Sequence, residues 1–116
     1  ARYSAEAEER GIGVLIAGAG AAAHLAGTLA AHSCLPILAV PLASSCLNGL
    51  DALLASVQMP RGVPVGVVAI DNSYNAGLLA VQILALQDPS LGRKLKAYKQ
   101  DLAAKVDAAN KEIESR

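Results

Sequence analysis

Between Arg10 and Asp51 lies a stretch of forty residues without an aspartate, glutamate, lysine or arginine. A bilayer crossing needs about 20 apolar residues, so length alone would allow a membrane span. Glycines, prolines and two histidines interrupt this stretch, however, at positions 11, 13, 18, 20, 24, 27, 32, 36 and 41. We therefore predict several short buried elements and no membrane partner. The polar first ten residues do not fit a signal peptide, and we expect a cytoplasmic protein.

Three short apolar runs predict the strands of a sheet. They cover residues 12–17, 35–40 and 64–70, with pairing of the second run starting just after Pro36. Each run is long enough for a buried parallel strand and too short for a helix. Residues 18–20 are expected to form a turn after the first strand, residues 41–45 a loop after the second, and residues 58–63 a loop before the third.

Segments with helical propensity alternate with these runs. The expected helices cover residues 2–10, 21–32, 46–57 and 74–86, followed by a last helix that starts at Pro89. Gly11 suits a helix stop, residues 71–73 supply turn and capping groups, and Asp88 suits the cap before a first-turn proline. The alternation predicts one α/β domain with a parallel sheet. Three strands are few for such a sheet, so either further strands exist or a partner supplies them.

The last helix carries one apolar stripe with steps of three and four residues. Its members are Leu91, Leu95, Tyr98, Leu102, Val106, Ala109 and Ile113. We divide the chain into residues 1–88, the core of the domain, and residues 89–116, this helix. The stripe fits packing on its own domain and docking on a neighbouring subunit equally well. The uncharged stretch and the aliphatic surplus also favour a homo-oligomer.

Composition excludes several classes of partner and site. Lysine plus arginine equals aspartate plus glutamate, so no basic excess favours a nucleic-acid partner. Aromatic residues make up 3% of the chain, which leaves few platforms for stacking bases. Cys34 and Cys46 match no metal spacing, and we expect two buried thiols in a reducing compartment. No metal-ligand cluster, serine–histidine–aspartate arrangement or pair of carboxylates on one helix face is apparent near the glycine loop.

Chemistry is expected at residues 17–27, AGAGAAAHLAG, after the first predicted strand. Ligands of open α/β sheets bind beyond the carboxyl ends of the strands, and glycine and alanine let a ligand approach the backbone. The GxGxxA pattern at residues 18–23 suggests a dinucleotide, but no acid follows before Asp51 to hold a ribose. His24 is either a satisfied structural histidine or the pH-active group of the site. His32 has no such loop beside it and is expected to be structural.

The same segment closely resembles the signature loop of the bacterial-type aminoimidazole ribonucleotide carboxylase family. Further matching segments follow in order: LPILAVP, SSCLNGLDALLASVQMP, RGVPVGVVAI and NAGLLAVQIL. The usual enzyme of this family is the class I N5-carboxyaminoimidazole ribonucleotide mutase. Its animal-type counterpart carries a different, Arg-Ser-Asn sequence at this loop. The resemblance covers about residues 5–100.

The resemblance implies a flavodoxin-like three-layer α/β subunit in an octamer, with active sites between subunits. The implied reaction is the isomerisation of N5-carboxyaminoimidazole ribonucleotide to 4-carboxy-5-aminoimidazole ribonucleotide in de novo purine biosynthesis. It runs through decarboxylation, trapping of carbon dioxide and recarboxylation in a closed pocket, without metal, ATP or organic cofactor. Proximity supplies most of the rate in such a pocket.

The family's roles map onto two segments of this chain. The implied substrate-binding residues are Gly18, Ala19, Gly20, Ala21, Ala22 and Leu25. His24 is implied as a supporting catalytic group that forms a polar wall or orients the substrate. Gln58, Met59 and Pro60 are implied to border the pocket or the subunit interface.

This chain departs from the family pattern at single positions and at its start. Ala21 stands where a second glycine is usual, Ala26 where proline is usual, and Ala52 and Ala55 where serines are common. The family's first βαβ portion, with its main catalytic histidine and its phosphate-binding arginine, has no counterpart here. Three interpretations stay open: part of a complete mutase, a truncated non-catalytic fragment that only assembles, or a relative that binds a nucleotide or performs another carboxylation.

Overall fold

The structure, a computed structural model, describes residues 2–20, 24–44 and 47–115 and shows an α/β fold. Three parallel strands form a sheet in the order β1-β2-β3. Their bounds are Leu15–Ala19 for β1, Ile37–Pro41 for β2 and Gly66–Val67 for β3. Leu15 pairs with Ile37 and Ala19 with Pro41, while Leu38 pairs with Gly66. The predicted fold class is confirmed.

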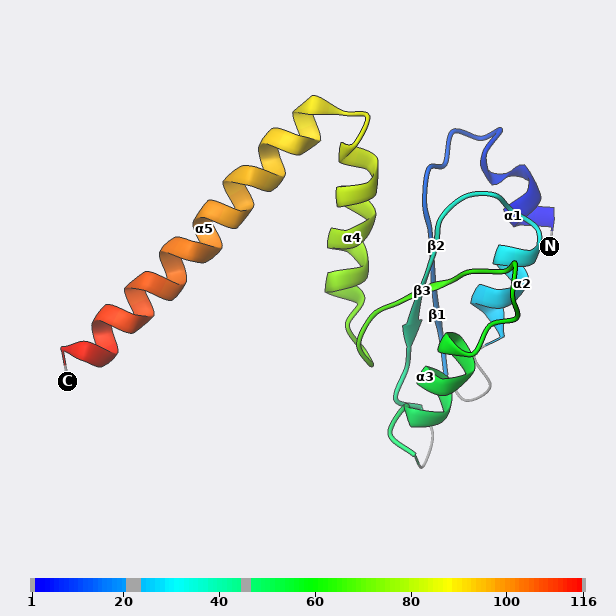
Figure 1. The fold of residues 1–116 in the computed structure, drawn as a ribbon, viewed down its shortest axis with the longest axis horizontal. Coiled ribbons are helices and arrows are strands. Elements are labelled where there is room, and N and C mark those ends of the chain that lie inside the picture. The colour runs from blue at the N-terminus through cyan, green and yellow to red at the C-terminus, as the bar shows by residue number, and fades with distance from the viewer. Residues whose placement is uncertain (1, 21–23, 45–46, 116) are drawn as a thin grey trace.

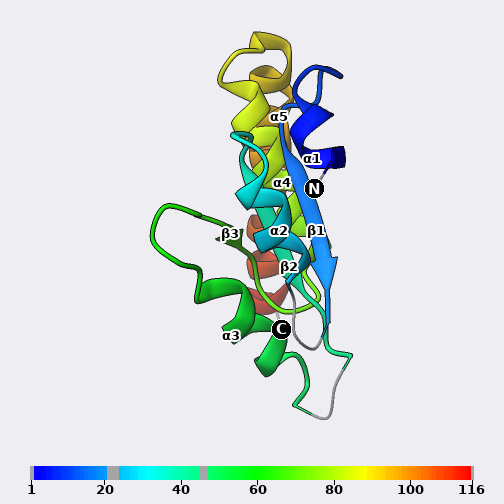
Figure 2. The ribbon, with the colours of Figure 1, turned by 90° about the vertical axis from the view of Figure 1, so that its right-hand side faces the viewer.

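Five helices accompany the sheet in the described residues. They are α1 (Arg2–Ala7), α2 (Leu25–Ala31), α3 (Leu50–Val57), α4 (Ser73–Ala85) and α5 (Pro89–Glu114). Helix α2 connects β1 to β2 and α3 connects β2 to β3. Both lie on one face of the sheet, whereas α4 covers the other face (Figure 1). This gives the three layers of a flavodoxin-like subunit. Figure 2 views the sheet from the side of α1 and α2, so that the layers lie one behind another.

Small aliphatic side chains build the core between the sheet and the helices. β2 is buried along its whole length, because it is the central strand and helices cover both its faces. The main core cluster consists of Ala7, Leu15, Ala17, Ala26, Ile37 and Ala39. Four of these six residues are alanines, which lets α1, α2 and the sheet approach closely.

The first strand starts and ends later than predicted. The Ile12 amide donates to the Ala7 carbonyl at 3.1 Å and closes the end of α1, where Gly11 adopts a φ of +82°. Residue 12 therefore belongs to a helix terminus, not to a strand. The predicted turn at residues 18–20 is also wrong, because Gly18 and Ala19 continue β1 opposite Val40 and Pro41.

The helix ends follow the predicted capping signals in the second half of the chain. The Asn72 side chain accepts from the Asn75 amide at 2.9 Å and starts α4. The Asp88 carboxylate accepts from the Ser90 and Leu91 amides and starts α5. Helices α1, α2 and α3 are shorter than expected, and β3 has only two residues instead of the seven predicted. The Asn72 amide donates to the Ala69 carbonyl, so the end of the predicted strand forms a turn.

Helix α5 extends away from the sheet and its helices (Figure 1). It contacts α4 and buries none of its own residues. Among the described residues, no helix combines the length and the apolar character that crossing a bilayer requires.

Candidate active site at the carboxyl edge of the sheet

The carboxyl ends of β1 and β2 meet at the edge where the sequence places the glycine loop. The Leu42 amide donates to the Ala19 carbonyl at 3.0 Å, so the ladder continues one residue beyond the strands. This bond places Gly20 beside the segment 42–44. Because α/β sheets bind ligands at this edge, the two segments form the floor of the candidate site.

Gly20 fits this place because it has no side chain. A Cβ atom at position 20 would overlap Ser44 Oγ and lie 2.8 Å from Ser44 Cβ. At Gly18 an added Cβ would lie 3.6 Å from Leu42 Cδ1, which is an ordinary contact. At position 20 the neighbouring loop leaves room only for glycine. At position 18 packing within this chain would also accept a side chain.

Asp71 ties the third loop of this edge to the second. Its Oδ1 accepts from the Ala43 amide at 2.9 Å, and its own amide donates to the Pro41 carbonyl at 2.8 Å. Its backbone has a φ of +60°, a conformation that aspartate tolerates better than most residues. The sequence pattern predicted only a turn residue here. A cross-loop bond of this kind has no signal in a single sequence.

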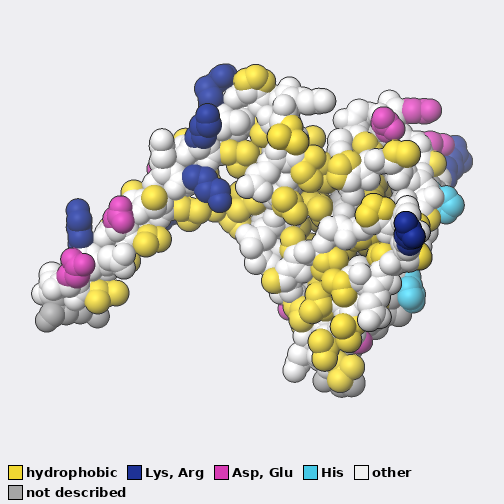
Figure 3. Space-filling view, viewed as in Figure 1, with side chains coloured by type: hydrophobic (Ala, Val, Ile, Leu, Met, Phe, Trp, Pro, Cys, Tyr) yellow, Lys and Arg dark blue, Asp and Glu magenta, His cyan; other side chains and the backbone are white. Residues whose placement is uncertain are grey.

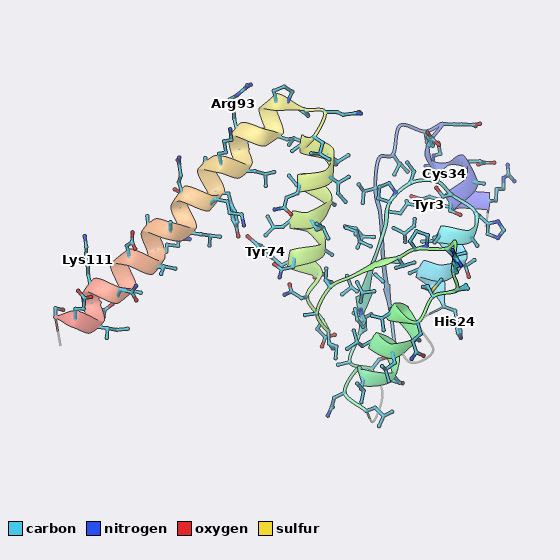
Figure 4. All side chains as sticks on the ribbon, viewed as in Figure 1. Tyr3, His24, Cys34, Tyr74, Arg93 and Lys111 are labelled. Carbon is cyan, nitrogen blue, oxygen red and sulfur yellow. The ribbon has the colours of Figure 1, made fainter. Side chains whose placement is uncertain are left out.

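His24 precedes the first turn of α2, near the carboxyl edge (Figure 4). Its carbonyl accepts from the Thr28 amide at 3.0 Å and from Thr28 Oγ1 at 3.1 Å. Its imidazole makes no capping hydrogen bond to the helix, and the residue is exposed. An exposed ring without a capping role is available to a substrate, so the geometry is compatible with the supporting role.

The other residues of the predicted site do not all lie at the carboxyl edge. Leu25 opens α2 and is 49% exposed, whereas Ala21 and Ala22 lie outside the described residues. Met59 packs on α2, because a Cβ at Gly27 would lie 2.9 Å from Met59 Cε. The Gln58–Pro60 segment therefore contacts the helix that follows the glycine loop. Its place at a pocket or a subunit interface stays a prediction.

A hollow that the sequence did not predict lies at the other end of α2 from the glycine loop. Its volume is about 460 Å³, and it opens to solvent near the start of β2. Its lining comprises Ala5, Glu8, Ala30, Ala31, His32, Ser33, Cys34 and Gly62. Cys34 is exposed, so its predicted burial is wrong, while Cys46 lies outside the described residues. In the described part of the chain, no three histidine, cysteine or acidic side chains are grouped to hold a metal ion.

Helix α3 presents an apolar face to solvent beside the carboxyl edge. Leu50, Leu54 and Val57 share one face of α3 as predicted, whereas Leu47 lies in the turn before the helix. Each of the four is about half exposed. Figure 3 shows hydrophobic side chains gathered over this helix. The residues that α3 buries are Ala52 and Ser56.

A comparison with protein families matches residues 1–105 to the family described as AIR carboxylase. The chain belongs to the AIR carboxylase family. The match includes both strands of the candidate site, the glycine loop and most of α5. The resemblance drawn from the loop sequence is thereby confirmed.

Curated members of the AIR carboxylase family are similar over most of this chain. The N5-carboxyaminoimidazole ribonucleotide mutase of Pyrococcus horikoshii is 53% identical over 112 residues, which cover 97% of this chain and 63% of the relative. The mutase of Thermotoga maritima is 54% identical over 90% of this chain and 61% of the relative. The mutase of Synechocystis is 49% identical over 97% of this chain and 64% of the relative. The chain thus spans about three fifths of the length of these relatives.

Proposed function

We propose that the full-length protein isomerises N5-carboxyaminoimidazole ribonucleotide to 4-carboxy-5-aminoimidazole ribonucleotide in purine biosynthesis. The observation that carries this proposal is the identity of about one half to relatives that bear the mutase name. The identical stretch covers nearly the whole chain and includes the candidate site. These relatives favour catalysis over the alternative of a non-catalytic fragment or a relative that only binds a nucleotide.

The candidate site has features that suit this chemistry. Residues 18–22 would pack their backbone against the imidazole ring and its carboxylate, and Leu25 would line the same wall. At Gly20 the absence of a side chain preserves the close approach of the Ser44 loop. His24 would orient the substrate or form a polar wall. In the proposed reaction the bond from the exocyclic nitrogen to the carboxylate breaks, carbon dioxide leaves, and the nitrogen keeps the electron pair and takes up a proton. Ring carbon four then attacks carbon dioxide and loses a proton, which balances the one taken up.

Incubation of the full-length protein with N5-carboxyaminoimidazole ribonucleotide tests the proposal. We expect formation of the 4-carboxy isomer, followed by ultraviolet absorbance and by chromatography of the product. Aminoimidazole ribonucleotide with bicarbonate serves as the control that separates isomerisation from carboxylation of free substrate. A protein that binds the N5-carboxy compound without ever isomerising it would contradict the proposal.

We further propose that the protein assembles as a homo-oligomer, an octamer by family resemblance, in the cytoplasm. Helix α5 supports docking on a neighbouring subunit over packing on its own domain. Leu102, Val106 and Ile113 of its apolar stripe are 40%, 57% and 66% exposed. Residues 1–88 would then form the core of the domain, and residues 89–116 the arm that reaches the neighbour.

A charge within the apolar stripe is expected to dissociate the oligomer. In Val106→Glu, burying a carboxylate against an apolar partner costs several kcal/mol, whereas the free chain keeps this position exposed. We expect a smaller species in sedimentation velocity at micromolar concentration with an unchanged circular dichroism spectrum. Ala104→Glu, on the opposite side of α5, is the matched control and should leave the assembly intact. An unaltered assembly in Val106→Glu would show that the stripe is not an interface.

A further inference from the structure

Tyr74 and Tyr98 form a hydrogen bond that bridges α4 and α5. Their hydroxyl oxygens lie 2.8 Å apart, although the residues are 24 positions apart in the chain. Figure 4 shows Tyr74 directed from α4 toward α5, away from the sheet. Three tyrosines are the only aromatic residues of the chain, and two of them meet at this contact.

The hydrogen bond lies far enough from the junction of α4 and α5 to constrain the angle between the two helices. The helices join at residues 86–88, and Tyr74 lies about 17 Å along α4 from that corner at 1.5 Å per residue. Tyr98 lies about 14 Å along α5 from the same corner. The segments of α4 and α5 between the corner and the two tyrosines have similar lengths, so a bond between their ends fixes the angle between the helices. At this radius, a 1 Å change between the hydroxyls turns α5 by about 4°.

The part of α5 beyond the bond lies at the surface of the described structure. Every described residue from Lys99 onward is exposed. A rotation of about 4° at the corner would move the far end of the 26-residue helix by roughly 3 Å. We propose that the Tyr74–Tyr98 hydrogen bond is a strut that sets the angle between α4 and α5 and so positions the distal half of α5.

The surroundings of the phenols support a specific pairing. The hydrogen bond to Tyr74 raises the pKa of Tyr98 above its ordinary value, with desolvation and the nearby phenol adding to the shift. Helix α4 carries no charged residue, and the charged residues one turn from Tyr98 on α5 are Lys94 and Asp101. Each phenol is thus the obvious partner for the other at this contact. Because the pKa of Tyr98 is raised, its phenol keeps its proton at neutral pH and can maintain the hydrogen bond.

Titration of the phenols tests whether the bond forms. In a Tyr3→Phe background, absorbance at 295 nm follows only Tyr74 and Tyr98. Adding Tyr74→Phe leaves Tyr98 alone, and we expect its pKa to fall to about 10, the ordinary value. An identical pKa of Tyr98 with and without the Tyr74 hydroxyl would overturn the pairing.

Distance measurement in the intact protein tests whether the bond sets the angle. Spin labels at exposed positions 82 and 100 report the separation of α4 and α5, with Cys34 and Cys46 replaced by serine. Labelled protein is diluted with unlabelled protein so that the distance within one chain is read. We expect Tyr74→Phe and Tyr98→Phe each to shift the distribution by several ångströms or to broaden it. Tyr3→Phe is the matched control and should leave it unchanged. A distribution in the double variant that superimposes on the parent would overturn the strut.

Discussion

Replacing Gly20 with alanine is expected to reduce turnover by about 100-fold and to lower the free energy of unfolding by about 1–3 kcal/mol. The added Cβ overlaps Ser44 Oγ and lies 2.8 Å from Ser44 Cβ, which no rotation of the serine hydroxyl can relieve. The two loops at the carboxyl edge must therefore separate. That displacement falls on the floor of the proposed site, where about 1 Å of misplacement is costly. Steady-state kinetics and chemical denaturation of the full-length protein measure both effects.

Gly77→Ala is the matched control for this substitution. Gly77 lies inside α4, and an added Cβ meets no atom within 4 Å. Alanine stabilises a helix interior by about 0.5–1 kcal/mol relative to glycine, so this variant should be at least as stable as the parent and as active. Parental turnover in Gly20→Ala would show that the Ser44 loop can yield without disturbing the site, and would remove this edge from the proposal.

Replacing His24 with asparagine is expected to lower kcat by about 100-fold while the fold is retained. General acid–base groups contribute about 10²–10⁴ to rate, and an orienting imidazole is lost as well. Asparagine is a favoured residue at a helix N-terminus, and the imidazole makes no capping bond that could be broken. The melting temperature should therefore stay constant or rise. Kinetics and thermal unfolding of the same preparation separate the catalytic role from a structural one.

His32→Asn provides the control for this second prediction. His32 is exposed at the opposite end of the same helix, where its amide donates to the Leu29 carbonyl at 3.1 Å. The chemical change is identical, and only its distance from the glycine loop differs. We expect turnover like that of the parent. If His24→Asn also turned over like the parent, His24 would be structural, and the supporting role would have to be withdrawn.

The sequence alone was sufficient to predict features that depend on residues close together in the chain. Asn72 and Asp88 cap their helices through bonds to amides two or three residues ahead, and both caps were predicted. The parallel order of the sheet followed from the alternation of strands and helices. The stripe of α5 followed from its periodicity.

Features that depend on distant partners could not be predicted from the sequence. Gly18 and Ala19 are extended because Val40 and Pro41 lie opposite, and residues of high turn propensity gave the contrary indication. Burial of Cys34 was expected from residue type, but the chain leaves α2 there on the solvent side. The regular spacing of the α3 leucines predicted that they share one face of the helix. It did not predict whether that face is buried or exposed.

The candidate site was only partly predictable for the same reason. The glycine loop and His24 could be identified because their residues form a recognisable local sequence. The bond between Asp71 and the Ala43 amide joins loops 28 positions apart, and only the folded chain brings them together. Met59 matched a family segment, yet its contact with α2 at Gly27 became apparent only from the structure.

Strand β2 is buried and α5 is mostly exposed, and this difference in burial determines which amides exchange with solvent first. Every residue of β2 is buried and pairs with β1, and Leu38 and Ala39 also pair with β3, so the amides of this strand exchange with water only when the sheet itself opens. The distal residues of α5 need to break only their own helical hydrogen bonds. In the dissociated chain, hydrogen-exchange protection should thus fall from nearly the global free energy of unfolding at Leu38–Val40 to almost nothing at the tip of α5. The distal part of α5 can therefore unfold and refold many times before the sheet unfolds once.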